Sequence, residues 1–380
     1  MRPDCASRHL QEYRALKERS SGTDFEMATW GNSRHLQIAD DPADHRVSTP
    51  TYSTSKGNMY HGDTLNWLDS PAIQDRYAKK VQLVFTSPPF PLNDKKSYGN
   101  LAGDAYIEWV KGFAPKLRDL LTDDGSIAIE IGNAWEPGSP TMSTVVLEAL
   151  LAFKKEADLH LCQEFVWYNP ARLPSPVQWV NIERIRVKDA YTRIWWLSPT
   201  PRPKANNRNV LKPYSKSMKK LIAKKSYNSG RRPSEHVIGE KSFLTDNGGS
   251  IPPNVIGADN APTITNMLKG SNTRSNDQYQ TYCRENQHTL HPARMPNELV
   301  SFFVRFLTEQ DDLVFDPFGG SNTTGAIAES EGRKWAACEA DWNFATTSIT
   351  RFDPDIVTRT GPGVKIYKRK GWIDQASSIA

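Results

Sequence analysis

The sequence predicts an α/β protein in which helices cover both faces of a mainly parallel sheet. Apolar stretches of strand length alternate with longer stretches whose apolar residues recur at helical spacing. This alternation occupies residues 51–168, breaks over residues 169–287 and resumes over residues 288–365. We therefore expect one domain in two halves, with a less regular region inserted between them and tails at residues 1–50 and 366–380.

The composition limits the class of protein. The 380 residues carry a formal net charge of +5, which indicates an anionic partner only if the excess is concentrated somewhere. The four cysteines (Cys5, Cys162, Cys283 and Cys338) lie far apart, so neither a disulfide framework nor a metal site is expected. The sequence contains no membrane span of about 18 apolar residues, and its start lacks the apolar core of a secretory signal. A cytoplasmic protein is the expectation.

The first residues show no sustained periodicity. Residues 1–50 are polar and are predicted to form a flexible tail with one short helix near residues 10–17. A strand at residues 59–61 then leads to a turn at Gly62 and Asp63 and to a short helix. Asp63 has two alternatives: an acid at the end of a strand can point into a cleft, or it can cap the helix.

The next strand, at residues 81–85, leads into Ser87, Pro88, Pro89 and Phe90. Two consecutive prolines neither continue a strand ladder nor enter a helix, so the chain leaves the sheet in a stiff extended turn. The Ser87 hydroxyl and the Pro88 carbonyl both accept hydrogen bonds, and the Phe90 ring can stack on a flat group. The exocyclic amine of a nucleobase fits this set. The alternative is a proline-stiffened loop without chemistry.

The remainder of the first half keeps the alternation. We expect a helix at residues 104–121, a strand at residues 125–132, a helix at residues 142–153 and a strand at residues 161–168. Aromatic side chains in the first of these helices recur at helical spacing and are expected in the core.

The inserted region holds the excess positive charge. Between Ala190 and Ser234 there are twelve lysines and arginines but no acidic residue, and five aromatic residues lie among them. A strand is expected only at residues 191–197. Uncompensated cations repel one another unless a polyanion neutralises them, so the region predicts nucleic-acid contact, against the alternative of a solvated face. The candidate contacts are Arg193, Arg202, Lys204, Arg208, Lys212, Lys219, Lys220, Arg231 and Arg232.

The last half has the outline of a nucleotide-binding βαβ unit. A helix at residues 296–308 precedes a strand at residues 313–315, and a glycine-rich turn with Gly319 and Gly320 opens a helix at residues 323–331. A strand at residues 335–338 then ends at Glu339, and a final helix is expected at residues 342–352.

Glu339 follows Gly319 by 20 residues, about the separation at which such an acid reaches ribose hydroxyls. Asn322 stands where many such turns carry another glycine. Asparagine is one of the few residues that tolerate left-handed backbone, so the departure is mild.

Two motifs resemble those of the amino-group DNA methyltransferases in their permuted β arrangement. They are Thr-Ser-Pro-Pro-Phe at residues 86–90 and, late in the chain, Asp-Pro-Phe-Gly-Gly-Ser-Asn-Thr-Thr-Gly at residues 316–325. Ser-Pro-Pro-Phe is similar to the motif of the N4-cytosine branch, and the likeness to the PvuII-type modification methylases covers most of residues 57–352. The resemblance implies a Rossmann-like methyltransferase fold, S-adenosylmethionine as cofactor and duplex DNA as substrate. It also implies an inserted target-recognition region and a cognate endonuclease acting on the same DNA site.

By this resemblance, Asp63 contacts the adenine amino group, Glu339 the ribose, and residues 318–322 the methionine part. The residues 291–294 (His-Pro-Ala-Arg) would start the helix that closes the pocket, while Glu130 has no role that the likeness settles. The cofactor-binding candidates are Asp63, Asp316, Phe318, Gly319, Gly320, Ser321, Asn322, Thr323 and Glu339. The catalytic candidates are Ser87, Pro88, Pro89 and Phe90.

The expected reaction is methyl transfer to the N4 amine of a cytosine flipped out of the duplex. No cysteine follows a proline, which disfavours attack at carbon 5 through a covalent intermediate. An N6-adenine methyltransferase is the nearest rival, because the two branches share a fold. More distant rivals are a nucleic-acid-binding protein with a degenerate cofactor pocket and a methyltransferase of RNA or small molecules.

Overall fold

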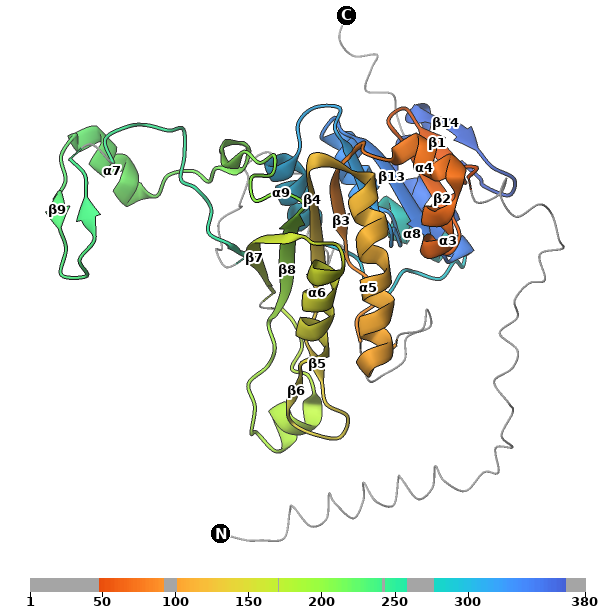
Figure 1. The fold of residues 1–380 in the computed structure, drawn as a ribbon, viewed down its shortest axis with the longest axis horizontal. Helices are drawn as coiled ribbons and strands as arrows, with labels where there is room; N and C mark the ends of the chain where they lie inside the picture. Colours follow the sequence, from red (N-terminus) through yellow and green to blue (C-terminus); the bar gives the residue numbers. More distant parts are fainter. Residues whose placement is uncertain (1–47, 92–100, 170, 241–242, 258–276, 367–380) are drawn as a thin grey trace, which may run out of the picture. The chain divides into compact units, whose positions relative to one another are not determined.

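The computed structural model describes residues 48–91, 101–169, 171–240, 243–257 and 277–366 (Figure 1). The expected N-terminal tail with its helix near residues 10–17, and most of the expected C-terminal tail, lie outside these residues.

Ten strands of the described chain form one sheet in the order β11-β7-β8-β4-β3-β12-β13-β2-β1-β14. The five strands from β4 to β2 run parallel to their neighbours, whereas β8 is antiparallel to both β4 and β7, and β1 is antiparallel to β2 and β14. The expected mainly parallel centre is therefore confirmed. The strands are β1 (Tyr52–Thr54), β2 (Gly57–His61), β3 (Val81–Thr86), β4 (Leu121–Ile131), β7 (His160–Tyr168), β8 (Tyr191–Ser198), β11 (Val255–Ile256), β12 (Leu313–Asp316), β13 (Lys334–Glu339) and β14 (Val357–Thr360).

Helices cover both faces of the sheet, as the alternation predicts (Figure 1). Side chains alternate across a strand, so neighbours such as Val84 and Phe85 of β3 belong to different buried clusters. One cluster contains α3 (Thr64–Asp69), α4 (Pro71–Tyr77), α5 (Gly103–Leu120) and α6 (Val145–Glu156). The other contains α9 (Asn297–Leu307), α10 (Thr323–Ser330) and α11 (Trp342–Thr347).

Two helix predictions were wrong at their ends. Met142 and Ser143, expected to start a helix, form β6 (Met142–Ser143), which pairs with β5 (Ala134–Trp135), and α6 begins only at Val145. The last helix continues past Thr347 as a 3₁₀ turn (Ser348–Arg351). Its serine and threonine hydroxyls donate to carbonyls three or four residues back, and such bonds compete with regular helix hydrogen bonding.

Strand β8 places part of the inserted region inside the main sheet. It hydrogen-bonds β4 and β7 and runs against both, so the residues before it and after it lie at opposite edges of the sheet. Residues after β8 form a 3₁₀ turn (Asn207–Val210), helix α7 (Lys216–Lys224) and a separate hairpin of β9 (Gly230–Arg231) and β10 (Val237–Ile238). Helix α7 has no buried residue, and Figure 1 shows α7 and β9 set apart from the sheet.

Candidate active site

The carboxyl ends of the parallel strands bring the two predicted motifs together. Strands β3 and β12 are direct neighbours, so the turn at residues 87–90 and the turn at residues 317–322 leave the sheet side by side. Glu339 ends β13, the next strand along, and Asp63 follows β2 beyond it. In open α/β sheets ligands bind at this edge, which we call the carboxyl edge.

Asp316 ties the two turns to each other. Its carboxylate accepts hydrogen bonds from the Thr86 hydroxyl (2.7 Å), the Thr324 hydroxyl (2.7 Å) and the Phe318 N–H (3.1 Å). Burial raises the pKa of Asp316 to about 6, although these three donors favour its charged form. The buried side chain thus positions the residues that precede Ser87 and those that follow β12. The expected direct cofactor contact of Asp316 stays a prediction.

Ser87 lies against a second buried carboxylate. Its hydroxyl is hydrogen-bonded to Glu130 of β4, and the Thr192 hydroxyl donates to Glu130 Oε1 at 2.8 Å. Glu130 is 7% exposed, and burial raises its pKa, while both hydroxyls and the charge of Arg172 oppose that rise. A serine that donates its proton to Glu130 keeps its oxygen lone pairs for another donor.

Phe90 packs on glycine backbone at the end of β4. A Cβ built on Gly132 would stand 2.7 Å from the Phe90 ring, closer than carbon atoms approach. The half-buried ring also contacts the core cluster under α5 and α6. Gly132 therefore makes room for the ring at the carboxyl edge, a role that sequence reasoning missed.

The turn at residues 317–322 adopts the shape that the sequence predicts. Asn322 has φ 55°, in the left-handed region, and its side-chain oxygen accepts the Gly325 N–H that starts α10. Its amide also donates to the Tyr52 hydroxyl at 2.9 Å. Asparagine thus replaces glycine at this position and caps the helix as well.

Glu339 faces the same turn. Its carboxylate accepts the Gly320 N–H (2.7 Å) and the Asp341 N–H (2.8 Å). Burial is the largest cause that raises its pKa to about 7, and the negative charges of Asp341 and Asp316 add to the rise. A partly exposed carboxylate held beside glycine backbone can accept hydrogen bonds from ribose hydroxyls.

The comparisons with known proteins agree with this arrangement. A model of the N6/N4 DNA methylase family, described as "DNA methylase", matches residues 81–350. The chain belongs to this DNA methylase family. It is 46% identical to the type II methyltransferase M.PvuII of Proteus hauseri, over 80% of this chain and 85% of that protein. It is 24% identical to M.BglII of Bacillus subtilis, over 84% and 77% of the two chains.

The solved structure named PvuII DNA methyltransferase (cytosine-N4-specific) superimposes with a TM-score of 0.60. The identity is 38%, over 80% of this chain and 88% of that one. The Rossmann-like methyltransferase fold expected from the sequence is thereby confirmed.

The other predicted cofactor residues of this methylase lie around the same turn. Phe318 packs on Trp109 and Phe113 of α5, with ring centroids 5.5 and 5.1 Å apart. Ser321 is buried, and its hydroxyl accepts from Arg351, while Thr323 begins α10.

Asp63 is the N-cap of α3, since its side chain accepts the Asn66 N–H at 3.0 Å. The cap alternative is confirmed, and the adenine contact stays a prediction.

His291 does not start a helix, contrary to the expectation for residues 291–294. The segment remains irregular as far as Pro296, and α9 begins at Asn297. The His291 ring instead lies over the glycine turn, where a Cβ on Gly320 would stand 2.9 Å from Nε2. Burial lowers the pKa of His291 to about 4, so the ring is neutral at physiological pH.

The nine predicted DNA-contacting cations do not form one surface. Arg193 pairs with Glu164 at 2.9 Å inside the sheet. Lys204 pairs with Asp312 at 2.7 Å, next to the start of β12, and Arg202 and Arg208 lie in the same stretch that follows β8. Arg202, Lys204 and Arg208 therefore lie at the edge opposite the carboxyl edge, away from the active site.

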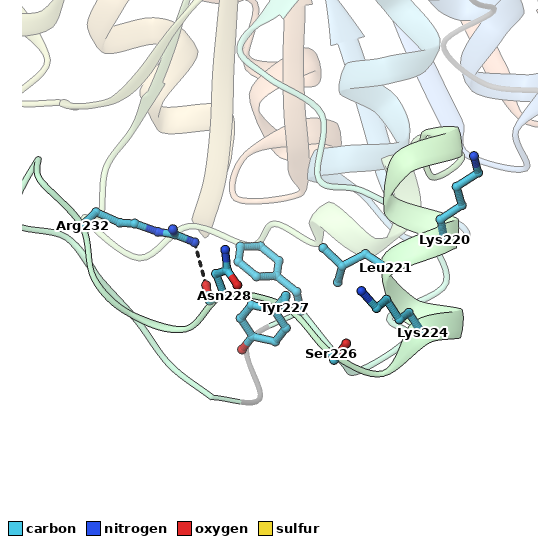
Figure 2. A pocket seen from close by; sticks show the side chains of 8 residues that line it. Lys220, Leu221, Lys224, Ser226, Tyr227, Asn228 and Arg232 are labelled. Carbon is cyan, nitrogen blue, oxygen red and sulfur yellow. Dashed lines mark hydrogen bonds between the residues drawn. The ribbon is translucent and has the colours of Figure 1, made fainter.

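The remaining predicted contacts lie in or just before the part of the chain that contains α7 and the β9–β10 hairpin, which is not part of the main sheet. Lys212 precedes α7 and exchanges two backbone hydrogen bonds with Ser250. Lys219 and Lys220 are on α7, and Arg231 and Arg232 are in the β9–β10 hairpin. Figure 2 shows a pocket here, in which Arg232 donates to the Asn228 carbonyl at 2.6 Å; it is lined by Lys220, Leu221, Lys224, Ser226, Tyr227, Asn228, Arg232 and Phe243.

Trp342 is a further candidate for cofactor contact at the carboxyl edge, and sequence reasoning missed it. It is 46% exposed, starts α11 and lies edge-on to His61, with centroids 5.0 Å apart. Its position three residues after Glu339 was the available signal.

Among the described residues, no group of His, Cys, Asp and Glu has the arrangement of a metal site. None of the helices in this part of the chain is long and apolar enough to cross a membrane.

The conformation of Asn322 gives a stability prediction. Asn322→Ala removes the helix cap and places a Cβ-bearing residue without polar compensation in left-handed backbone, so we expect a loss of about 2 kcal/mol in unfolding free energy. Asn322→Gly tolerates that backbone, and we expect it to cost less than about 1 kcal/mol. Urea denaturation of both variants measures the difference. Equal losses would show that the left-handed backbone contributes nothing to the choice of asparagine.

Proposed function

We propose that this chain transfers a methyl group from S-adenosylmethionine to the exocyclic N4 of cytosine in duplex DNA. The observation that carries the proposal is the contact of Ser87 with Glu130 next to the glycine turn. Buried Asp316 holds the two turns together, because it accepts hydrogen bonds from Thr86, just before Ser87, and from Thr324, just after the glycine turn. A relative with 38% identity whose name specifies cytosine N4 supports the choice of base. As a member of its family, the chain acts on DNA.

The carboxyl edge fits the cofactor. A Cβ on Gly319 would stand 3.2 Å from the Ala337 side chain and 3.3 Å from the Cys338 carbonyl, so the turn is already as close to β13 as its backbone allows. Glu339 would hold the ribose hydroxyls, and residues 318–323 would hold the methionine part. When bound, S-adenosylmethionine supplies an electrophilic methyl group on its sulfonium.

Ser87 and Pro88 would hold the amine of the base. The N4 lone pair is delocalised into the cytosine ring, so it is a poor nucleophile until its N–H groups are bound by acceptors that favour a tetrahedral nitrogen. The Ser87 oxygen can accept one N–H because its own proton goes to Glu130, and the Pro88 carbonyl can accept the other. The proton released from N4 can pass to Ser87 while the Ser87 proton passes to Glu130. The carboxylate thus takes up the proton and no covalent intermediate forms.

Base flipping is required because N4 is paired inside the duplex, and unpairing costs a few kcal/mol. Stacking on Phe90, fixed against Gly132, would offset part of this at about 1–3 kcal/mol per base. Pro89 keeps the turn stiff between the acceptors and the ring. DNA contacts would supply the rest, and the cations of α7 and the β9–β10 hairpin remain candidates for them.

The proposal has wider consequences. Residues 51–168 and 288–365 would be the catalytic and cofactor-binding halves of one domain, and residues 169–287 the target-recognition region. The chain would be the modification enzyme of a restriction–modification system in a bacterial or archaeal cytosol. Its endonuclease would act on the same site without a stable complex.

The product and the role of Ser87 are tested together. Ser87→Ala removes an acceptor but leaves the cofactor turn untouched, so we expect normal binding of cofactor and DNA with methyl transfer slower by about 10²-fold or more. The wild-type product is expected to be N4-methylcytosine, identified in nucleoside digests. Formation of N6-methyladenine would favour the adenine branch, and absence of any methylated base in a cofactor-binding protein would favour the degenerate pocket.

Glu130 predicts an acid limb in the rate of methyl transfer. If the ionised carboxylate takes up the proton, the single-turnover rate should fall as the pH is lowered through the raised pKa of Glu130. Glu130→Gln should be slower by about 10-fold or more and should lose this limb. Thr192→Val is the matched control: loss of its hydrogen bond destabilises the charged form, so the limb should move to higher pH. Identical pH profiles for all three proteins would remove Glu130 from the reaction.

Glu339 predicts a pH dependence of cofactor affinity. Its pKa of about 7 means that the free protein holds a proton there below neutrality, whereas ribose hydroxyls are bound best by the ionised form. The dissociation constant of S-adenosylmethionine should therefore fall as the pH rises from about 6 to about 8. At the lower pH, binding should release a proton. Calorimetry in buffers of different ionisation enthalpy measures both quantities. Glu339→Gln should bind more weakly and without this dependence; a wild type without proton release would contradict the assignment.

A further inference from the structure

The connection between β7 and β8 exposes an unusual number of large aliphatic side chains. We call residues 171–188 the edge segment. Five of its side chains are largely exposed within 15 residues: Leu173 (80%), Val177 (55%), Ile182 (65%), Ile185 (58%) and Val187 (88%). Single exposed aliphatic residues are common, but a cluster of this size on a protein surface marks an interaction site.

The topology puts the edge segment beside the active site. Strand β7 runs in the same direction as β4 and β3, because β8 is antiparallel to both β7 and β4. The chain therefore leaves β7 at the carboxyl edge, where Ser87 and Phe90 lie. Arg172 fixes the segment there by donating to the Tyr191 carbonyl at 3.0 Å, and its charge acts on Glu130.

A second contact holds the far end of the segment. Arg186 lies over the Trp135 ring, 3.8 Å from its centroid, and donates to the Pro140 carbonyl of the β5–β6 hairpin. The segment is thus held near both ends, at Arg172 and at Arg186, while the aliphatic side chains between these anchors and Val187 just after them remain exposed. Anchored backbone with exposed side chains is suited to presenting them to a partner.

The charge of the edge segment specifies the partner. It contains Arg172, Arg184, Arg186 and Lys188 but only one acidic residue, Glu183. An apolar surface of this charge complements DNA, in which phosphates flank stacked bases. Proteins that distort DNA insert leucine, isoleucine and similar side chains between base steps and so offset the cost of unstacking.

We propose that the edge segment binds the duplex around the base to be methylated. Leu173 and Val187 insert into the gap that opens in the base stack when the target base flips out. This inference rests on the proposed function, because it needs a DNA substrate whose target base is unpaired. Arg184, an exposed cation that anchors neither end of the segment, then contacts a flanking phosphate. Leu173 and Val187 are chosen because they have the highest exposure in the segment.

The test is a double variant, Leu173→Gln with Val187→Thr, assayed on two DNA duplexes. On duplex DNA with the target cytosine paired to guanine, we expect its single-turnover rate to fall about 10- to 100-fold. On the same duplex with the target cytosine mispaired, unpairing is no longer required, and we expect most of the rate to return. Leu151→Gln on α6, where the leucine is 47% exposed, is the matched control and should behave as wild type on both duplexes.

Three outcomes would overturn the proposal. They are a wild-type rate for the double variant on paired DNA, a loss that the mispaired duplex does not restore, and a change from dimer to monomer by sedimentation. The last would assign the surface to a second copy of the chain. Binding of S-adenosylmethionine by the double variant confirms that it is folded. If the wild type itself forms no methylcytosine on paired DNA, the proposed function fails; if it does, only the edge segment is at issue.

Discussion

The buried carboxylate of Asp316 is the constraint on which the site depends. It accepts hydrogen bonds from two hydroxyls and one N–H of residues within or next to the catalytic and cofactor turns. Thr86 and Asp316 are 230 positions apart, and only the pairing of β3 with β12 brings them together. Because all three donors are buried or half-buried, loss of the acceptor would leave them unsatisfied at an expected cost of about 1–3 kcal/mol each. The distance between the two turns is therefore fixed by the fold rather than by the ligands.

The reversal of direction at β8 divides the inserted region. Residues before β8 lie at the carboxyl edge with Ser87, whereas residues after it begin at the opposite edge. A run of cations that is continuous in sequence is thus split in space, and Lys204 is paired with Asp312 far from the site. The uncharged, aliphatic residues of the edge segment, which composition alone does not single out, lie on the same side of the sheet as Ser87.

The sequence predicted β2, β3, β4, β7, β8, β12 and β13 and the two turns because those features are local, whereas the short strands β1, β11 and β14 were not predicted. A strand followed by two prolines, or by two glycines and a helix, is recognisable without knowledge of the partners. The contacts of Glu130 could not be predicted in this way. Ser87 follows β3 and Thr192 lies on β8, so the positions of these partners depend on the order β8-β4-β3 in the sheet. The pairing of Arg193 with Glu164 was missed for the same reason: Glu164 lies 29 positions away on β7, opposite Trp195, and reaches Arg193 only because β7 and β8 pair.

Three acidic side chains at one edge also determine which ligand this edge favours. Glu130, Asp316 and Glu339 all have raised pKa values because burial disfavours their charged forms, and the charge of Asp316 contributes to the rise at Glu339. No lysine or arginine of the described chain forms an ion pair with any of them, and their donors are hydroxyls and backbone N–H groups, with the charge of Arg172 acting on Glu130. A ligand that carries positive charge lowers the free energy of such a site, whereas an anionic dinucleotide raises it. The sulfonium and ammonium groups of S-adenosylmethionine carry such positive charge. The burial that disfavours the ionised carboxylates in the free protein therefore favours binding of the cofactor.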